Sequence, residues 1–485
     1  MVKLFERAAG MQRRARAQLF VATAVAVALV GGGAAIGQAP VPAAPYPAAL
    51  AHQPSPLPDW IMLTWTGDPA HTQAVTWRTS SAVATPQAQI AVSEGGPQFV
   101  DDAETLAANR STPVQADLGF PNLFHTVDFT GLQAETQYLY RVGDGENWSE
   151  WLEFTTASED REPFSFIYFG DAQNDIHQHW SRVIRRAYSD RPEAELIVHA
   201  GDLVNTSTSD QQWGEWFWSG GWIDGMVPSV GTPGNHEYAG AVLTPYWNAQ
   251  FAFPDNGPQG TGPLYEAMKG TVYYVDYQGV RFVSLNSNSV ASGAQSAEWW
   301  SIQAQWLDQV LTDNPNKWTV LTFHHPVFST ASGRDNPALR AAWRPIIEKH
   351  NVDLVLQGHD HSYGRGNVPT GASTESDRTV YVVSVSGPKM YEVSDETWTA
   401  NGAEPKKLGQ NLQLYQLVDV FQELNADGEV REVLRYEART ATGEPYDLFE
   451  IRKGPNGHKK IIEVTHDGSE DAHAQTHELG HAHTH

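Results

Sequence analysis

The sequence predicts a multidomain chain, in which a β-sandwich is followed by a layered α/β domain. Three observations support this fold class. The chain has 485 residues, more than a single ordinary domain usually contains. Residues 58–157 carry short apolar runs separated by turn residues, whereas residues 160–455 alternate apolar runs with stretches of helical periodicity. Apolar residues make up 41% of the sequence, which is enough to give both domains a sizeable core.

Residues 1–39 predict a signal peptide for export. Basic residues between Lys3 and Arg16 precede an apolar run, Leu19 to Val30, and small residues that end near Ala39. That run is short for a bilayer span, but its extension to Ile36 leaves an uncleaved anchor as the alternative. We therefore expect a periplasmic or extracellular protein with no stable membrane span once the signal is removed. Residues 40–57, rich in Pro and Ala, predict a flexible linker.

The charge and the cysteine count exclude several classes of function. The formal net charge of -25 argues against a protein that coats nucleic acid, because a polyanion would be repelled. A small phosphorylated substrate remains compatible, since bound metal ions dominate the field of their own site. The chain has no cysteine, which removes thiolate metal ligands and cysteine nucleophiles. Nothing in the sequence predicts an oligomeric state.

The first folded domain, residues 58–157, is predicted to be a β-sandwich. Strands are expected at 61–65, 73–77, 89–92, 125–129 and 132–142. The last of these places Thr136, Tyr138 and Tyr140 at alternate positions and resembles the penultimate strand of fibronectin type III modules. For the two tyrosines we expect a packing role.

The second domain, residues 160–455, is predicted to alternate strands and helices before it closes with β-structure. Apolar strands are expected at 164–169, 195–199, 318–323 and 352–356, helical faces at 180–188, 299–311 and 339–347, and closing strands between 411 and 451. Residues 465–485 hold six histidines among acidic and small residues and predict a disordered tail. Loose binding of Zn(II), Cu(II) or Ni(II) by that tail is the alternative.

Five polar blocks follow predicted strands and carry the chemistry of the sequence. They are Gly170-Asp171, Gly201-Asp202, Gly234-Asn235-His236-Glu237, His324-His325-Pro326 and Gly358-His359-Asp360-His361. Loops at the carboxyl ends of strands in an α/β sheet converge on one edge, so these side chains can meet although they lie far apart in the sequence. Carboxylate, amide and imidazole groups together suit a pair of metal ions, which can activate hydroxide and hold a phosphoryl group. The blocks therefore predict a metal-dependent phosphoesterase.

With these blocks, residues 163–390 resemble the calcineurin-like metallophosphoesterases, and the sandwich before them makes the whole resemble the purple acid phosphatases. The resemblance implies a four-layer α/β domain, with two packed mixed sheets flanked by helices. It also implies two metal ions (Fe, Mn or Zn, with Mg as a further candidate) and a bridging hydroxide. Asp202 would bridge the ions; Asp171 and His361 would complete the first site, and Asn235, His324 and His359 the second. His236 would face the phosphate and assist the leaving oxygen.

Two positions depart from the family pattern. The purple enzymes place a tyrosine three residues after the bridging aspartate, where this chain has Asn205. Other branches carry Asp-x-His in the first block, where this chain has Gln173. Either amide can lend an oxygen to the first metal or lie behind its ligands. Because neutral oxygen ligands stabilise Fe(III) less than a phenolate does, we expect a colourless site that prefers divalent ions.

The contacts to substrate are less well specified. The purple enzymes carry a histidine pair downstream of the His-x-Pro block, and this chain has Ser332 to Asn336 there. Arg334 can contact phosphate, with a surface or helix-capping role as the alternative. Hydrolysis of phosphomonoesters is the leading function. Phosphodiester cleavage is the second, and a non-catalytic protein that holds metal or attaches to a surface is the third.

Overall fold

The computed structural model describes residues 46–289, 294–369, 376–424, 428–454 and 457–464. The predicted signal at 1–39 and the His-rich tail at 465–485 lie outside these ranges. Part of the predicted linker is helical, because Ala48–Ala51 form the single turn α1, as Ala-rich sequence favours. No helix in the described ranges is long and apolar enough to cross a membrane.

The N-terminal domain is a sandwich of two four-stranded antiparallel sheets, with strand orders β1-β2-β6-β5 and β4-β3-β7-β8. The strands are β1 Asp59–Thr64, β2 Thr72–Ser80, β3 Gln87–Val92, β4 Glu104–Ala107, β5 Arg110–Gln115, β6 Pro121–Thr130, β7 Gln137–Gly143 and β8 Leu152–Thr155, and a 3-10 turn η1 spans Pro97–Asp102. Trp77 and Tyr140 are among the buried side chains between the two sheets, so the predicted sandwich is confirmed. The prediction missed β4 and β5 because most of their residues are exposed and form no apolar pattern.

The first sheet of the α/β domain has seven strands in the order β11-β10-β9-β21-β22-β23-β24. They are β9 Phe164–Phe169, β10 Leu196–His199, β11 Ser229–Gly231, β21 Leu414–Leu424, β22 Val430–Thr440, β23 Pro445–Lys453 and β24 Lys459–Glu463. Strands β9 to β11 are parallel and the rest are antiparallel, so the sheet is mixed. The predicted end of this domain at 455 is too early, because β24 pairs with β23 beyond it. Its sequence, Lys-Lys-Ile-Ile-Glu, has too short an apolar run to be recognised.

The second sheet also has seven strands, in the order β14-β15-β16-β17-β19-β18-β20. They are β14 Tyr273–Tyr277, β15 Val280–Ser284, β16 Trp318–Thr322, β17 Leu354–Gln357, β18 Tyr363–Asn367, β19 Val380–Val383 and β20 Glu404–Gly409. The two sheets pack face to face. The ring of Phe166 on β9 lies edge-on to Phe282 on β15, with 5.2 Å between the centroids, and the Tyr168 hydroxyl donates to the carbonyl of Gln357.

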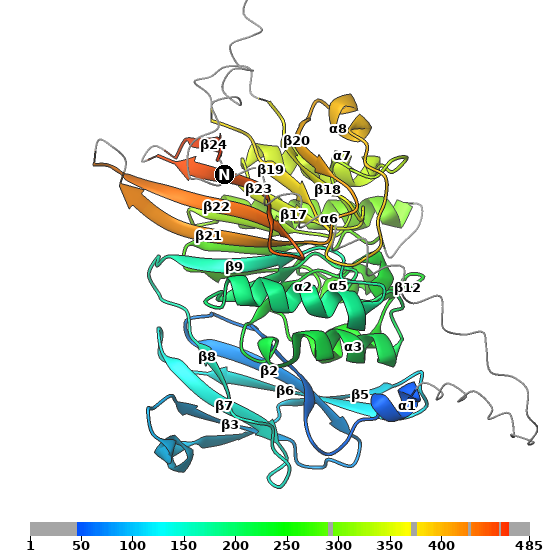
Figure 1. Ribbon diagram of the computed structural model, residues 1–485, viewed down its shortest axis with the longest axis vertical. Helices are drawn as coiled ribbons and strands as arrows, with labels where there is room; N and C mark the ends of the chain where they lie inside the picture. Colours follow the sequence, from blue (N-terminus) through cyan, green and yellow to red (C-terminus); the bar gives the residue numbers. More distant parts are fainter. Residues whose placement is uncertain (1–45, 290–293, 370–375, 425–427, 455–456, 465–485) are drawn as a thin grey trace, which may run out of the picture. The chain divides into compact units, whose positions relative to one another are not determined.

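Helices cover the outer faces of both sheets, which completes the four layers that the sequence predicts. Helices α2 (Ile176–Asp190) and α3 (Asp210–Gly220) lie beside one another next to β9 (Figure 1), and α6 (Ala294–Thr312) packs with α7 (Pro337–Lys349) on the second sheet. Short elements complete the fold: η2 Gly221–Ile223, η3 Asn235–Glu237, β12 Tyr238–Ala239, β13 Val242–Leu243, α4 Pro245–Gln250, α5 Pro263–Met268 and α8 Glu396–Ala400.

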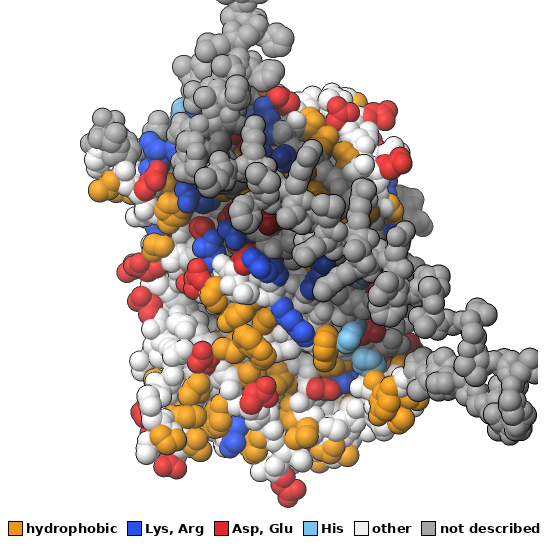
Figure 2. Space-filling view, in the orientation of Figure 1, with side chains coloured by type: hydrophobic (Ala, Val, Ile, Leu, Met, Phe, Trp, Pro, Cys, Tyr) orange, Lys and Arg blue, Asp and Glu red, His pale blue; other side chains and the backbone are white. Residues whose placement is uncertain are grey.

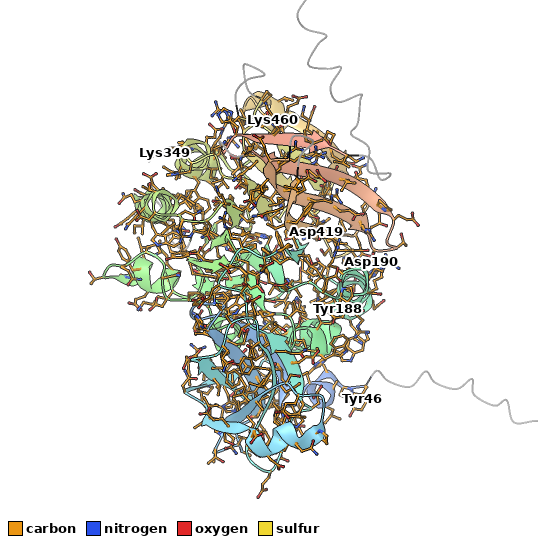
Figure 3. All side chains as sticks on the ribbon, turned by 90° about the vertical axis from the view of Figure 1, so that its left-hand side faces the viewer. Tyr46, Tyr188, Asp190, Lys349, Asp419 and Lys460 are labelled. Carbon is orange, nitrogen blue, oxygen red and sulfur yellow. The ribbon has the colours of Figure 1, made fainter. Side chains whose placement is uncertain are left out.

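Ion pairs attach α2 to the first sheet. Asp190, at the end of α2, accepts a hydrogen bond from Arg439 Nη1 at 3.0 Å, and Arg191 Nη2 donates to Asp419 on β21 at 3.2 Å (Figure 3). On the face drawn in Figure 2, basic and acidic side chains are intermingled rather than separated into patches of one sign.

Candidate metal centre

The five polar blocks meet at the carboxyl ends of neighbouring parallel strands. Asp171, Asp202 and Asn235 follow β9, β10 and β11 on the first sheet, and His324, His359 and His361 follow β16 and β17 on the second. Because the sheets pack face to face, the loops of both sheets lie at one edge of the domain. This topology brings together side chains that are separated widely in the sequence.

The loops of the centre approach one another too closely for most side chains. A Cβ atom on Gly234 would lie 2.1 Å from Asp202 Oδ1, and one on Gly201, whose φ is +88°, would lie 2.5 Å from the backbone nitrogen of Gly234. Asp202, His359 and His361 themselves adopt left-handed backbone conformations, with φ of 53°, 74° and 46°. Each such conformation costs about 1 kcal/mol or more and persists only where surrounding contacts impose it, which is typical of functional sites.

Four donor atoms converge at the predicted second metal position. His324 Nε2 lies 3.1 Å from Asp202 Oδ2, 3.2 Å from Asn235 Oδ1 and 3.2 Å from His359 Nδ1. One donor atom from each of Asp202, His324 and His359 falls within a mutual distance of 4.8 Å. Atoms bound to one Zn(II)-sized ion at roughly 2.0–2.2 Å are about 3 Å or slightly more apart, so this spacing suits a shared ion.

The hydrogen bonds around this position also leave donor atoms available for a metal ion. His324 Nδ1 lies 2.8 Å from the carbonyl of Ala200, and donation to that carbonyl leaves Nε2 with a bare lone pair. Asn235 Oδ1 and the Asp202 carboxylate are acceptors as well. Lone pairs that face one another at this distance repel unless a cation lies between them. The donor set of one carboxylate, one amide oxygen and two imidazoles therefore matches a borderline divalent metal.

The buried carboxylates make the centre favour positive charge. Burial alone would lower the pKa of His324, but Asp202 and Asp171 outweigh it and raise the pKa to about 9. Burial likewise opposes ionisation of Asp202, yet its contacts with His324 and His236 lower its pKa to about 2. A protonated imidazole and a metal ion are alternative ways to supply the positive charge that this cluster favours.

The donor atoms of the predicted first metal position lie farther apart than those of the second. His361 Nε2 lies 3.8 Å from Asp171 Oδ2, and the latter is buried without a hydrogen-bond partner among the described residues. The Gln173 amide lies between the two halves, with Nε2 at 2.8 Å from Asp202 Oδ2 and 3.1 Å from His361 Nε2. Gln173 Oε1 is also buried and unpartnered in the described part of the chain. The structure thus places Gln173 among the candidate ligands.

Asn205 occupies a different place from Gln173. Its side-chain Oδ1 accepts from Asn174 Nδ2 at 3.0 Å, and its backbone carbonyl accepts from His236 Nδ1 at 2.6 Å. The backbone amide of His236 donates to Asp202 Oδ1 at 2.8 Å. Asn205 and Asp202 together hold the His236 ring beside the cluster, with Nε2 left as the atom available to a ligand.

Arg334 and His325 support the loops of the centre. Arg334 Nη1 donates to the carbonyl of His359 at 2.9 Å, so the guanidinium holds the strained His359 backbone rather than capping a helix. His325 Nδ1 lies 2.9 Å from Ser287 Oγ, and its ring centroid lies 4.2 Å from that of His359. Both side chains therefore help to hold His359, a proposed metal ligand, in position.

Sequence reasoning missed the role of Glu237. Its buried carboxylate accepts backbone N–H groups from Asp202, Leu203 and Gly234 at 2.7–2.8 Å. Burial, and then the charge of Asp202, raises the pKa of Glu237 to about 7. The available signal was its place in the Gly-Asn-His-Glu block, but only the structure shows that it joins the Asp202 and Asn235 loops.

Comparison with known proteins agrees with this geometry. Residues 58–156 match the N-terminal domain of purple acid phosphatases, and residues 169–363 match the calcineurin-like phosphoesterases. Residues 169–363 therefore form a calcineurin-like phosphoesterase domain. The N-terminal sandwich is of the purple acid phosphatase type, as the resemblance implies.

Several curated relatives are similar to this chain at low identity. An uncharacterized protein of Mycobacterium tuberculosis is 26% identical over 344 residues, covering 63% of this chain and 61% of its own length. Purple acid phosphatase 23 of Arabidopsis thaliana is 24% identical over 307 residues, covering 56% of this chain and 64% of its own length. This chain thus spans less than two thirds of the length of these curated relatives. A purple acid phosphatase from seeds of yellow lupin (Lupinus luteus) has the same fold, with a TM-score of 0.61 and 17% identity over 83% of this chain and 75% of that structure.

Proposed function

We propose that this protein is an exported phosphomonoesterase that works with two bound metal ions. The convergence of bare donor atoms at Asp202, Asn235, His324 and His359 is the observation that carries the proposal. Asp171, Asp202 and His361 are the proposed ligands of the other ion. When bound, the two ions would supply an activated water and neutralise charge on the phosphate.

The side chains of this chain would position the phosphate ester and manage one proton. Hydrolysis adds water to phosphorus and breaks the ester P–O bond, and the leaving oxygen takes up a proton. His236 is the proposed donor of that proton, because the Asn205 carbonyl holds its Nδ1 and thereby stabilises the ring when Nε2 is also protonated. Its backbone bond to Asp202 keeps the ring in reach of the phosphate site.

Gln173 is the proposed fourth ligand of the first ion. Turning its amide about the last side-chain bond exchanges Nε2 and Oε1, and this places an oxygen beside Asp202 Oδ2 and His361 Nε2. The first ion would then have two carboxylates, one amide oxygen and one imidazole, and no phenolate. This set favours Mn(II), Zn(II), Fe(II) or Mg(II) over Fe(III). Protein loaded with iron in air should be colourless, and a strong visible charge-transfer band would contradict the assignment.

Release of phosphate from p-nitrophenyl phosphate with added Mn(II) or Zn(II) tests the function. We expect activity in the wild type, a large loss in His236→Ala, and no activity in Asp202→Ala. Asp101→Ala, which removes an exposed carboxylate in the sandwich, is the matched control and should behave as wild type. Equal activity in wild type and Asp202→Ala would refute the proposed centre.

Two further measurements separate the rival functions. Bis-p-nitrophenyl phosphate, assayed in parallel, distinguishes a diesterase from a monoesterase. Metal analysis of a variant without residues 465–485 distinguishes an enzyme from a protein that holds metal with its tail. About two retained ions support the enzyme, and loss of all metal supports the tail. Export is tested separately, by locating the protein in fractionated cells and sequencing its N-terminus.

A further inference from the structure

A cleft opens beside the proposed second metal position. Its volume is about 450 Å³, within the range of small-molecule sites. Asn235 and His325 form its wall toward the metal centre, and Tyr238, Ser287, Asn288 and Trp300 are among its other lining residues. A group attached to a phosphate at the centre would have room here.

The cleft has no unpaired charge to meet a charged ligand. Among the described lining residues the only charged side chain is Asp335, and its carboxylate accepts from Arg340 at 2.6 and 3.1 Å. Arg334 and Lys389 belong to the loops that hold His359 and His361, and neither lines the cleft. A second anionic group would therefore lose hydration here without gaining a cation.

Asn288 lines the cleft and carries a buried acceptor without a donor. Its Nδ2 donates to the carbonyl of Pro233 at 2.8 Å and to Asn286 Oδ1 at 3.2 Å, which fixes the orientation of the amide. The residue is only 7% exposed, and its Oδ1 has no hydrogen-bond partner among the described residues. A buried acceptor without a donor costs about 1–3 kcal/mol, and a ligand hydroxyl would remove that cost.

Tyr238 and Trp300 complement this acceptor. The Tyr238 oxygen accepts from Asn286 Nδ2 at 2.7 Å, and burial raises the pKa of its hydroxyl above the ordinary value, so the O–H proton remains available for donation. Trp300 is partly buried and lies edge-on to Trp343, with ring centroids 5.2 Å apart. An indole of this kind offers an apolar surface for a ring.

We propose that this cleft binds the leaving group of the substrate, and that the leaving group is a neutral ring bearing hydroxyl groups. The proposal rests on the phosphomonoesterase function. A ring hydroxyl donates to Asn288 Oδ1, another accepts from Tyr238, and the ring packs on Trp300. Sugar monophosphates and nucleoside monophosphates share this chemistry. Polyanionic esters, such as inositol polyphosphates and nucleoside triphosphates, do not fit it.

The test compares kcat/KM of the purified full chain for five substrates. These are p-nitrophenyl phosphate, glucose phosphate, adenosine monophosphate, inositol hexakisphosphate and adenosine triphosphate. We expect at least one of the two neutral-ring monoesters to exceed both polyanions by about tenfold or more, the effect of one well-made hydrogen bond. The ratio between the glucose and adenosine esters shows which of the two sources the cleft prefers.

Two variants test the named contacts. Asn288→Ala and Tyr238→Phe should each lower kcat/KM for the preferred monoester about tenfold more than for p-nitrophenyl phosphate, which lacks hydroxyl groups. Asn109→Ala, an exposed amide in the sandwich, is the control and should change neither. Thermal unfolding of each variant shows whether it is folded, and Tyr238→Phe retains the ring if Asn288→Ala does not fold.

Distinct outcomes separate this proposal from the one on which it rests. Hydrolysis of p-nitrophenyl phosphate together with equal or faster hydrolysis of the polyanions overturns the cleft assignment and leaves the phosphomonoesterase standing. The cleft assignment is also overturned if both variants lower kcat/KM by the same factor for every substrate. Absence of hydrolysis of every ester overturns both proposals.

Discussion

The two halves of the proposed metal centre would share Asp202 but differ in how closely their donor atoms meet. In the second half, His324 Nε2 has three donor atoms at 3.1–3.2 Å. In the first half, His361 Nε2 and Asp171 Oδ2 are 3.8 Å apart, and the Gln173 amide lies beside them. The second half has two imidazoles, whereas the first has one. The difference teaches that one bridging carboxylate can serve two unequal positions, and we expect the second to bind its ion more tightly.

Removing one imidazole from each half tests this inequality most strongly. His324→Ala should lose both ions on dialysis, because it destroys the tighter position and leaves only the weaker one. His361→Ala should keep about one ion per chain. Both variants should lose phosphate release by more than about 100-fold, a loss that even changes behind the ligands can produce.

Metal analysis by mass spectrometry and a p-nitrophenyl phosphate assay measure the two effects. His350→Ala, a histidine at the end of α7 that pairs with Asp308, serves as the control for the loss of an imidazole. Retention of one ion by His324→Ala and of none by His361→Ala would reverse the ranking of the two halves.

A change at Gln173 sharpens the comparison within the first half. Gln173→Ala should weaken one of two metal-binding events about tenfold more than the other, because Gln173 Nε2 lies 2.8 Å from the shared Asp202 and 3.1 Å from His361, which is a proposed ligand of the first ion alone. Gln173→Glu should strengthen the same event, since it adds a carboxylate. Calorimetric titration of metal-free protein with Mn(II) resolves the two events. Asn205→Ala is the matched amide control, and an equal effect there would count against the distinction between the two amides.

A change at Glu237 should affect both halves alike. Its carboxylate holds the backbone of Asp202, the shared ligand, and that of Gly234. Glu237→Gln leaves at least one of these N–H groups without a good acceptor, at a cost of about 1–3 kcal/mol. We expect both metal affinities to fall several-fold and the thermal midpoint of the metal-free protein to fall with them. A loss confined to one titration event would show that Glu237 serves only one position.

The sequence predicts the positions of the polar blocks more completely than it predicts the individual strands around them, for a physical reason. Four of the five polar blocks follow apolar strands, such as Phe164–Phe169, whose six residues are all buried, whereas the third follows the three-residue strand β11. Such strands are recognisable locally, and the convergence of their ends follows from topology. Strands β4, β5 and β24 lack that contrast and were missed.

The sequence does not distinguish a residue that faces the proposed metal ligands from one that lies behind them. Gln173 and Asn205 are both amides close to a predicted ligand, and local pattern treats them alike. The structure distinguishes them because Asn174 takes the Asn205 side chain, whereas Gln173 faces Asp202. Glu237 was missed for a similar reason. Two of the N–H groups that donate to its carboxylate lie more than thirty positions away in the sequence, on the Asp202 loop. Long-range hydrogen bonds of this kind leave no periodic signal.

The smallest expected effect concerns His125, a histidine that is as buried as those of the proposed centre but has different hydrogen-bond partners. His125 in the sandwich is fully buried, but hydroxyls of Thr79 and Ser111 lie 2.8 Å from its two ring nitrogens. Burial lowers the pKa of His125 to about 4 from an ordinary value of 6.5. Between these two pH values the unfolded chain therefore binds a proton at His125 that the folded chain does not bind. The free energy of unfolding is thus unaffected by this group above pH 6.5 and falls as the pH drops toward 4.

This loss should amount to about 2 kcal/mol of unfolding free energy between pH 7 and pH 4.5. His125→Gln should unfold more readily at pH 7 but lose less on acidification, because glutamine does not titrate. Urea unfolding of both proteins, freed of metal by a chelator so that ion release does not contribute, measures the two slopes. Equal slopes would mean that His125 does not carry the pH dependence. A reduced slope would show that His125 carries the pH dependence, as expected of a buried histidine whose two ring nitrogens face hydroxyl groups, in contrast to His324, whose Nε2 faces the other donor atoms of the proposed centre.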